Sequence, residues 1–416
     1  MNHGEDAGKS AHDRRPPSVA RRGSVQRVLE VLRLDGPSSQ AALARRTGLS
    51  RATVNAIVKG LRDEGVAEVR PVNGRESLVA LVSSNAAVVA VQVNVGSLRA
   101  AVFDFGRMTR LDTEIPYAEG SEDVGIALVS DTVMALAARA GLGPEELAGV
   151  AVAMQAPIAR ATGTIASWAQ LQLPAWTDVP IADTLAERLG IPVIADNDAN
   201  LAALAEWTWG AGRGAADFLY VMCAAGVGGG FVIDGKIYRG GDGLAGEIGH
   251  MVLESHGPVC FCGSRGCLTT FVSEKFLLLA LEDSGSSRKS LKEIVAAARR
   301  GDPACRRVLY EAGRHLGRAF ANTAKLMAPS VIAVGGALSE AGPLLFESIE
   351  SSVEVHSLRA VSPSIRFVPA RLGDDTALLG GLAAVLADAG QGVSTLPEWV
   401  RQPATVRDVN SQARNR

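Results

Sequence analysis

The stretch from Gly246 to Cys267 gathers residue types that bind metal ions, and it reads GEIGHMVLESHGPVCFCGSRGC. Four possible nitrogen and sulfur ligands fall within eighteen residues: His250, Cys260, Cys262 and Cys267. Four such donors with short spacers form a tetrahedral zinc site. If all four bind, no position is left open for water. The pattern therefore predicts a structural Zn²⁺ that fixes the loop carrying Glu247 and His250.

Two other interpretations of these cysteines are buried free thiols and a disulfide. A disulfide between Cys260 and Cys262 would be strained, because the side chains of such a close pair point apart. Gly263 and Gly266 allow the backbone to fold back so that the thiolates converge. We therefore favour the zinc site.

A second candidate for chemistry is Asp198, in the polar turn DNDAN at residues 196–200. The turn follows an expected buried strand at 193–195, and a carboxylate at the carboxyl end of such a strand points into a cleft. There it could act as a general base toward a hydroxyl group. The alternative is that Asp198 only caps the helix expected at 200–209.

An α/β framework is expected to position these residues. Residues 87–107 and 218–240 share one pattern, two strands around a glycine-containing turn, which indicates an internal duplication. Further strands are expected at 150–153, 193–195 and 331–334, and helices at 123–140, 180–189, 200–209, within 271–328 and at 372–386. Alternation of strands and helices is typical of α/β domains.

The N-terminal part has a different organisation. Residues 23–65 predict three short helices, and residues 66–82 predict two strands joined by a turn. Gly48 lies in a tight turn between the second and third helices, and Ser50 caps the third. A short helix, a turn, a helix with a polar outer face and then a hairpin is the winged helix-turn-helix arrangement of DNA-binding proteins.

The predicted DNA contacts lie on the third helix and in the wing. Base edges are assigned to the residues near the helix start: Arg51, Thr53 and Asn55. Lys59 is placed to contact phosphate, and Arg75 to contact phosphate or the minor groove. The alternative is a generic three-helix interaction module with a solvated basic face.

Charge supports the DNA interpretation. Residues 1–82 carry 14 Lys/Arg against 9 Asp/Glu, whereas the remainder carries 28 against 35. A basic segment at 1–82 followed by an acidic remainder indicates that only residues 1–82 contact nucleic acid. The chain shows no apolar run of the roughly 18 residues that a membrane span needs and no secretion signal at its N-terminus. We expect a cytoplasmic protein, in which reduced cysteines can bind metal.

Two motifs carry a resemblance to a known family: GLAGEIGH at 243–250 and CFCGSRGC at 260–267. The chain resembles the ROK family of sugar kinases and sugar-responsive repressors, from about residue 23 to about 386. The resemblance implies a two-lobed actin-like ATPase (ribonuclease H-like) fold. It assigns sugar binding to four residues, with Asp198 as the catalytic base if the protein is a kinase: Asn197, Asp198, Glu247 and His250.

The nucleotide site that the resemblance implies is degenerate. The D-x-G-G-T-like turn of ROK kinases corresponds to QVNVG, where Gln92 replaces the acid and Val95 places a branched side chain where amides should approach phosphate. In the second turn, AAGVGGG, Ala225 replaces a hydroxyl residue. Gly228 and Gly335 remain. Because phosphoryl transfer depends on positioning and charge stabilisation, these losses affect essential parts.

Two further departures concern the cleft. The family commonly has an acid two residues after the last cysteine, and this chain has Thr269 there. The loop around Gln155 and Pro157 lacks the glycine expected before its proline. The ligand could therefore differ from the family's common hexoses.

These interpretations predict five segments. They are a disordered basic tail at 1–20, a winged helix-turn-helix at 21–82, a first lobe at 83–200 completed by 375–388, a second lobe with the zinc loop at 201–374, and a loose C-terminal tail at 389–416.

The leading hypothesis is a sugar-responsive transcriptional regulator of carbohydrate metabolism, a repressor without enzymatic activity. As a homodimer or dimer of dimers it would bind a palindromic operator. The second hypothesis is an ATP-dependent sugar kinase with a DNA-binding appendage. The third is a regulator whose sugar cleft is vestigial.

Overall fold

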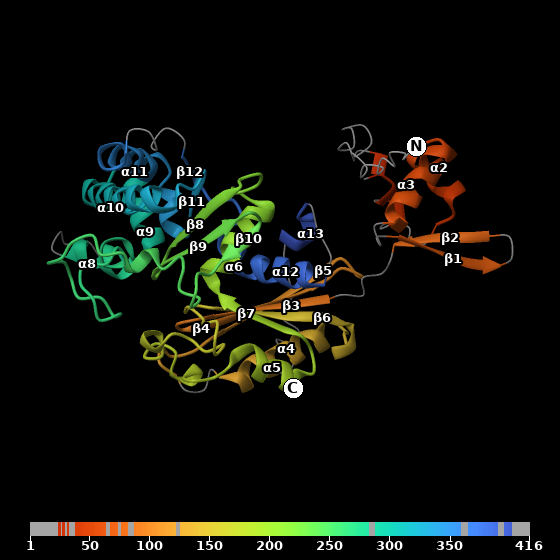
Figure 1. Ribbon diagram of the computed structural model, residues 1–416, viewed down its shortest axis with the longest axis horizontal. Coiled ribbons are helices and arrows are strands. Elements are labelled where there is room, and N and C mark those ends of the chain that lie inside the picture. The colour runs from red at the N-terminus through yellow and green to blue at the C-terminus, as the bar shows by residue number, and fades with distance from the viewer. Residues whose placement is uncertain are drawn as a thin grey trace, which may run out of the picture. The chain divides into compact units, whose positions relative to one another are not determined.

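The computed structural model separates into two compact units, residues 1–84 and 85–416 (Figure 1). The residues that it describes are 24–25, 27–29, 31–32, 38–63, 67–73, 76–81, 87–121, 125–282, 288–358, 365–389 and 395–401. The predicted tail at 1–20 and Arg75 lie outside the described residues, as does most of the predicted C-terminal tail.

The first unit contains the predicted helices and wing. Its elements are α2 (Gln40–Thr47), α3 (Arg51–Asp63), β1 (Ala67–Asn73) and β2 (Glu76–Leu81). The Ser39 hydroxyl accepts the Ala42 N–H at 3.2 Å and caps α2, and the Ser50 hydroxyl accepts the Thr53 N–H at 3.1 Å at the start of α3.

Buried apolar side chains join the helices of this unit to its wing. Residues 27–29 and 31–32 are helical and contribute to a core made of Val28, Leu32, Leu43, Val54, Ile57, Val58, Leu61, Ala67 and Val79. Strands β1 and β2 pair antiparallel, and Ser38 extends this pairing through a bridge to Val79. The winged helix-turn-helix prediction is therefore confirmed.

The second unit contains two five-stranded sheets with the same strand order. The first has the order β5-β4-β3-β6-β7 and the second β10-β9-β8-β11-β12. In each, a three-stranded antiparallel meander continues into two parallel strands. The first sheet comprises β3 (Ala87–Asn94), β4 (Ser97–Asp104), β5 (Thr109–Pro116), β6 (Leu147–Met154) and β7 (Val193–Asn197). The second comprises β8 (Asp217–Cys223), β9 (Val227–Ile233), β10 (Lys236–Tyr238), β11 (Val331–Gly335) and β12 (Arg366–Pro369). The predicted duplication is confirmed.

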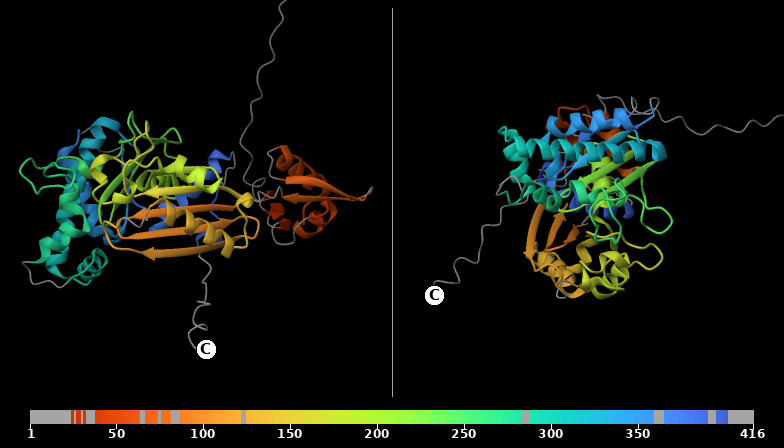
Figure 2. Two further views of the ribbon diagram at one scale, coloured as in Figure 1. Left: turned by 90° about the horizontal axis from the view of Figure 1, so that it is seen from below. Right: turned by 90° about the vertical axis from the view of Figure 1, so that its left-hand side faces the viewer.

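Helices cover both faces of each sheet. On the first sheet, α4 (Ile126–Arg139) and α5 (Ile181–Leu189) pack on one face and α12 (Thr376–Asp388) on the other. On the second sheet, the outer face is covered by α8 (Glu274–Glu282), α9 (Leu291–Arg299), α10 (Pro303–Met327) and α11 (Pro343–His356). Figure 2 shows α10 and α11 side by side. Helices α6 (Asp198–Trp209) and α12 lie between the two sheets (Figure 1). Within the described residues, no helix is long and apolar enough to cross a membrane.

The segment 395–401 differs from the predicted loose tail. It contains α13 (Glu398–Arg401), in which Val400 is fully buried and Trp399 packs edge-on against Phe105 with ring centroids 5.1 Å apart. The Val400 carbonyl also accepts a hydrogen bond of 2.8 Å from Arg110. The prediction is wrong for this segment because two apolar residues suffice to anchor it, too few to give a periodic pattern.

Candidate functional site

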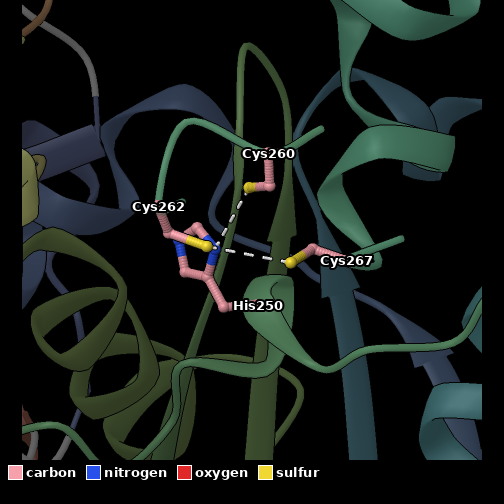
Figure 3. Close-up of side chains that lie close together, drawn as sticks. All are labelled: His250, Cys260, Cys262 and Cys267. Atoms are coloured by element: carbon pink, nitrogen blue, oxygen red, sulfur yellow. Dashed lines mark hydrogen bonds between the residues drawn. The ribbon is translucent and has the colours of Figure 1, made fainter. Parts of the chain in front are cut away.

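The predicted zinc ligands converge on one point (Figure 3). The ligand atoms of His250, Cys260, Cys262 and Cys267 all lie within 4.8 Å of one another. The sulfurs of Cys262 and Cys267 are 3.8 Å apart, and His250 Nδ1 lies 3.5 Å from the Cys260 sulfur. With Zn–S about 2.3 Å and Zn–N about 2.0–2.1 Å, a tetrahedron has S–S edges of about 3.8 Å and S–N edges of about 3.6 Å. The four residues therefore fit a tetrahedral zinc ion.

Local backbone hydrogen bonds fold this loop. The Cys260 N–H donates to the Ser264 carbonyl at 2.8 Å, and the Leu253 N–H donates to the Gly266 carbonyl at 2.8 Å. Gly266 has a φ of 61°, and a Cβ there would lie 1.7 Å from the Glu254 carbonyl oxygen. Only glycine fits this crossing, so the loop shape follows from the local sequence.

The two ring nitrogens of His250 face different groups. Nδ1 lies in the sulfur cluster, and Nε2 lies 4.0 Å from a carboxylate oxygen of Glu247. Burial lowers the pKa of His250, which favours the neutral imidazole that binds metals. Two rings hold the imidazole edge-on: Trp168 at 4.8 Å and Phe261 at 5.1 Å between centroids. Because Trp168 lies between β6 and β7 of the first sheet and His250 between β10 and β11 of the second, this contact joins loops of both lobes.

Asn197, not Asp198, caps α6. The Asn197 side-chain oxygen accepts the N–H groups of Ala199 and Asn200 at 3.0 and 3.2 Å. One oxygen of Asp198 accepts the Ala199 N–H at 2.8 Å. The other, Oδ2, is buried and has no hydrogen-bond partner among the described residues. A buried acceptor without a donor costs free energy, so a donor that reached this oxygen would be bound favourably.

Burial raises the pKa of two carboxyl groups, those of Asp198 and Glu247. It raises the pKa of Asp198 to about 7. Burial, and then the charge of Asp198, raises the pKa of Glu247 to about 7. The carboxyl groups of Asp198 and Glu247 therefore lie near each other, although one begins α6 and the other lies in the loop after β10.

Glycines of β9 allow these two elements to approach. A Cβ on Gly230 would lie 2.5 Å from the Ala199 carbonyl oxygen in α6, and a Cβ on Gly229 would lie 2.7 Å from the Gly246 carbonyl oxygen. Gly246 directly precedes Glu247. The glycine run thus allows the segments that carry Asp198 and Glu247 to pack close together, a role that needs no phosphate.

Arg239 was not anticipated from the sequence. It forms an ion pair with Asp196, with nitrogen–oxygen distances of 2.8 and 2.6 Å. Asp196 lies in β7 at the edge of the first sheet and Arg239 follows β10, so the pair links the two lobes beside Asp198. An arginine in a loop gives no sequence signal for a partner more than forty positions away.

In the turn at residues 92–96, compared above with a phosphate turn, a backbone amide is hydrogen-bonded to a side chain of the same chain. The Val95 N–H, which would face a phosphate in a kinase, donates to the side-chain oxygen of Gln155 at 2.7 Å. Gln155 lies in the loop that lacks the expected glycine. Gln92 is buried, and its side-chain oxygen has no hydrogen-bond partner in the described part of the chain. Ala225 is exposed at the tip of the β8–β9 turn.

The glycines that remain in the nucleotide motifs have packing roles. A Cβ on Gly228 would lie 3.1 Å from the Ala199 methyl group, and a Cβ on Gly335 would lie 2.3 Å from the Tyr220 hydroxyl. Their presence therefore does not require a nucleotide. Thr269 begins α7 (Thr269–Val272) and is buried directly after the zinc loop.

The predicted DNA-contacting residues of α3 are all exposed: Arg51, Thr53, Asn55 and Lys59. The opposite face of the helix carries the core residues named above. The Thr53 hydroxyl lies 2.8 Å from the Ser50 hydroxyl.

Comparisons with known proteins agree with this geometry. The ROK family profile matches residues 88–389, and a winged helix-turn-helix DNA-binding profile matches residues 22–68. The chain is 38% identical over 221 residues to a glucokinase of Halalkalibacterium halodurans, covering 50% of this chain and 67% of that protein. It is 26% identical over 364 residues to a xylose repressor of Bacillus spizizenii, covering 86% of this chain and 94% of that protein.

A solved structure extends the likeness to the fold. It is that of a ROK family transcriptional regulator described as a homologue of the E. coli MLC protein, with a TM-score of 0.67 and 24% identity. The match covers 89% of this chain and 96% of that one. The predicted fold class is confirmed.

Proposed function

The chain belongs to the ROK family, and from that premise we propose that it is a sugar-responsive, DNA-binding transcriptional regulator that acts as a repressor. The observation that carries the proposal is one chain holding both a winged helix-turn-helix and a ROK cleft whose first phosphate turn is closed by Gln155. The xylose repressor, similar over nearly its whole length, supports the same function.

DNA recognition is assigned to α3 and the wing. Arg51 and Asn55 reach base edges through hydrogen bonds, and Thr53 contributes its methyl group. Lys59 and Arg75 contact the backbone or the minor groove. A homodimer would place two such units on a palindromic operator, with half-sites about 34–36 Å apart or a multiple of that.

Sugar binding is assigned to the cleft. Asp198 accepts a hydrogen bond from a sugar hydroxyl through Oδ2, and Asn197 donates from its amide. Glu247 and His250 bind from the facing loop. A sugar that contacts both elements favours a closed cleft, and in a dimer this changes the separation of the DNA-binding units. The sugar acts only through its unequal affinity for the two states.

The metal assigned to the cluster is a structural Zn²⁺. It would bind His250 Nδ1 and the three thiolates, fixing the tautomer in which Nε2 carries a proton toward the cleft. Metal and sugar would then share one side chain. Removing the metal would loosen the sugar-binding loop as well as the cysteines.

A second candidate function is sugar phosphorylation. The similarity to a glucokinase favours it, as does Asp198, whose raised pKa suits a general base. The occupied amide of Val95, and Gln92 in place of an acid, oppose it because phosphoryl transfer needs a positioned nucleotide.

Gel-shift assays on the DNA upstream of the chain's own gene test the proposal. We expect a specific complex that one sugar from a panel of mono- and disaccharides dissociates, and loss of the complex in Asn55→Ala. The absence of a specific complex at moderate salt would count against a regulator. Sugar-dependent ADP release that Asp198→Asn abolishes would establish the kinase instead. A complex that no sugar affects, with no sugar raising the melting temperature, would indicate a vestigial cleft.

A further inference from the structure

A small cavity lies beside the first turn of α12, where β5, the loop before α12 and α13 meet. Its volume is about 80 Å³, and it is lined by Arg110, Arg371, Leu372, Asp375, Leu379 and Arg401. None of these residues belongs to the metal cluster, the sugar cleft or the phosphate turns. The volume is several times the roughly 10–15 Å³ that one water requires, and far below that of a nucleotide.

The floor of the cavity is a fully paired arginine. Arg110 has no exposed side-chain area; it donates to Asp112 at 2.7 and 2.6 Å and to Asp375 at 2.7 Å. The second oxygen of Asp375 accepts from Arg99 at 2.5 Å. The only carboxylate among the lining residues is therefore bound by two arginines, which lower the pKa of Asp375.

The other two arginines are not paired. Arg371 and Arg401 are exposed, and their guanidinium groups have no hydrogen bond or ion pair within the described ranges. The lining thus carries three positive charges and one negative charge. Adding the ion-pair partners Arg99 and Asp112, and the Glu206 carboxylate that accepts the N–H groups of Arg371 and Leu372, leaves an excess of one positive charge. Like charges around a partly enclosed cavity repel, and a small anion there would remove that cost.

We propose that this cavity binds the phosphoryl group of a small anion. Arg371 and Arg401 donate hydrogen bonds to the phosphate oxygens, as arginine does in planar, two-point recognition. An organic group attached to the phosphate would extend into solvent.

Such an anion would connect α13 to the helix that carries Asp198. Arg401 ends α13, and the N–H groups of Arg371 and Leu372 donate to Glu206 of α6 at 2.7 and 2.8 Å. Binding of the anion should therefore reduce the motion of both α13 and the loop before α12. The proposal does not depend on sugar binding or on DNA.

Titration calorimetry of the full chain with inorganic phosphate, in phosphate- and sulfate-free buffer at constant ionic strength, tests this site. We expect saturable binding with a Kd of about 1 mM or tighter, a range that a few charge-assisted hydrogen bonds can supply. The double variant Arg371→Gln/Arg401→Gln should bind at least about tenfold more weakly. Arg213→Gln, which removes an exposed arginine elsewhere in this unit, is the matched control and should bind like the parent.

Glycerol 3-phosphate distinguishes two sources of the phosphoryl group. Tighter binding than that of inorganic phosphate would identify an organic phosphate as the ligand, and equal or weaker binding would identify free phosphate. Hydrogen exchange of the 395–401 amides should slow when either binds. No saturable binding below about 10 mM, or equal binding by the parent and the double variant, would overturn the proposal.

Discussion

Replacing Asp198 by asparagine should stabilise the protein at pH 8 while weakening sugar binding. Asp198 is only 3% exposed, and burial raises the pKa of its carboxyl from 3.8 to about 7. Between these two values the folded state holds a proton that the unfolded state has released. Stability therefore falls as the pH rises through this range, and the loss is complete above pH 7.

The magnitude follows from the size of the shift. Each unit is worth about 1.4 kcal/mol, so the ionised carboxylate costs on the order of 4 kcal/mol at pH 8. Asparagine keeps an oxygen for the Ala199 N–H and carries no charge. For a unit of this size the gain corresponds to a melting temperature about 5 °C higher at pH 8. At pH 4, close to the lower of the two pKa values, the difference in stability should shrink to about 0.6 kcal/mol and the two proteins should unfold nearly alike.

Urea unfolding at pH 4 to 8 measures this difference. The parent should lose stability with rising pH relative to Asp198→Asn, by about 1.4 kcal/mol per unit between pH 5 and 7. Asp131→Asn, at a carboxylate 74% exposed in the same unit, is the control and should follow the parent. If Asp198→Asn and the parent show the same pH dependence, Asp198 is not held neutral by burial and the cleft assignment loses its electrostatic basis.

Three further predictions address the metal, the DNA contacts and the buried carboxylate of Glu206 in α6. The parent should contain about one zinc ion per chain, and Cys262→Ser should lose most of it and bind sugar more weakly. Cys305→Ala is the control and should keep the metal. Full zinc content of Cys262→Ser by elemental analysis would contradict the site. Lys59→Ala should weaken binding to operator DNA and to non-specific DNA equally, and should reduce the slope of log affinity against log salt by about 1. Asn55→Ala should instead cost about 1–3 kcal/mol of binding free energy at one base pair. Binding titrations over a salt series test this, and the same effect from both variants would contradict it. Glu206→Gln should lower the free energy of unfolding by about 1–3 kcal/mol, because the fully buried Glu206 carboxylate accepts three backbone N–H groups; an unchanged urea midpoint would refute this role.

Features encoded by neighbouring residues were predictable. His250 and the three cysteines lie within one short stretch, so their spacing predicted the cluster that the structure shows. That this cluster binds zinc stays a prediction. The serine caps and apolar periodicity of the first unit indicated its helices for the same reason. The repeated hairpins indicated the duplicated sheets, because the pattern occurs twice in the sequence.

Features that depend on distant pairs were not predictable. The cap of α6 is Asn197 and not Asp198, a choice that depends on which side chain the strand end directs toward the helix. The edge strands β5 and β12 are half polar and gave no clear pattern of apolar residues. Helix α11 follows a glycine-rich turn and likewise gave no clear pattern. The packed segment 395–401 is fixed by Arg110, almost three hundred positions earlier.

The sequence by itself determined which histidine and cysteines cluster, the winged helix-turn-helix fold, and the presence of Gln92 and Ala225 in the two turns compared with phosphate turns, because these depend on residue type and short spacing. Three contacts were decided only by the tertiary structure. The Gln155 side chain accepts the Val95 N–H, Arg239 forms an ion pair with Asp196, and Trp168 packs on His250. Each of these contacts joins residues brought together by the two sheets and α6. Such proximity is a property of the folded chain, since burial and distance exist only once the lobes have packed.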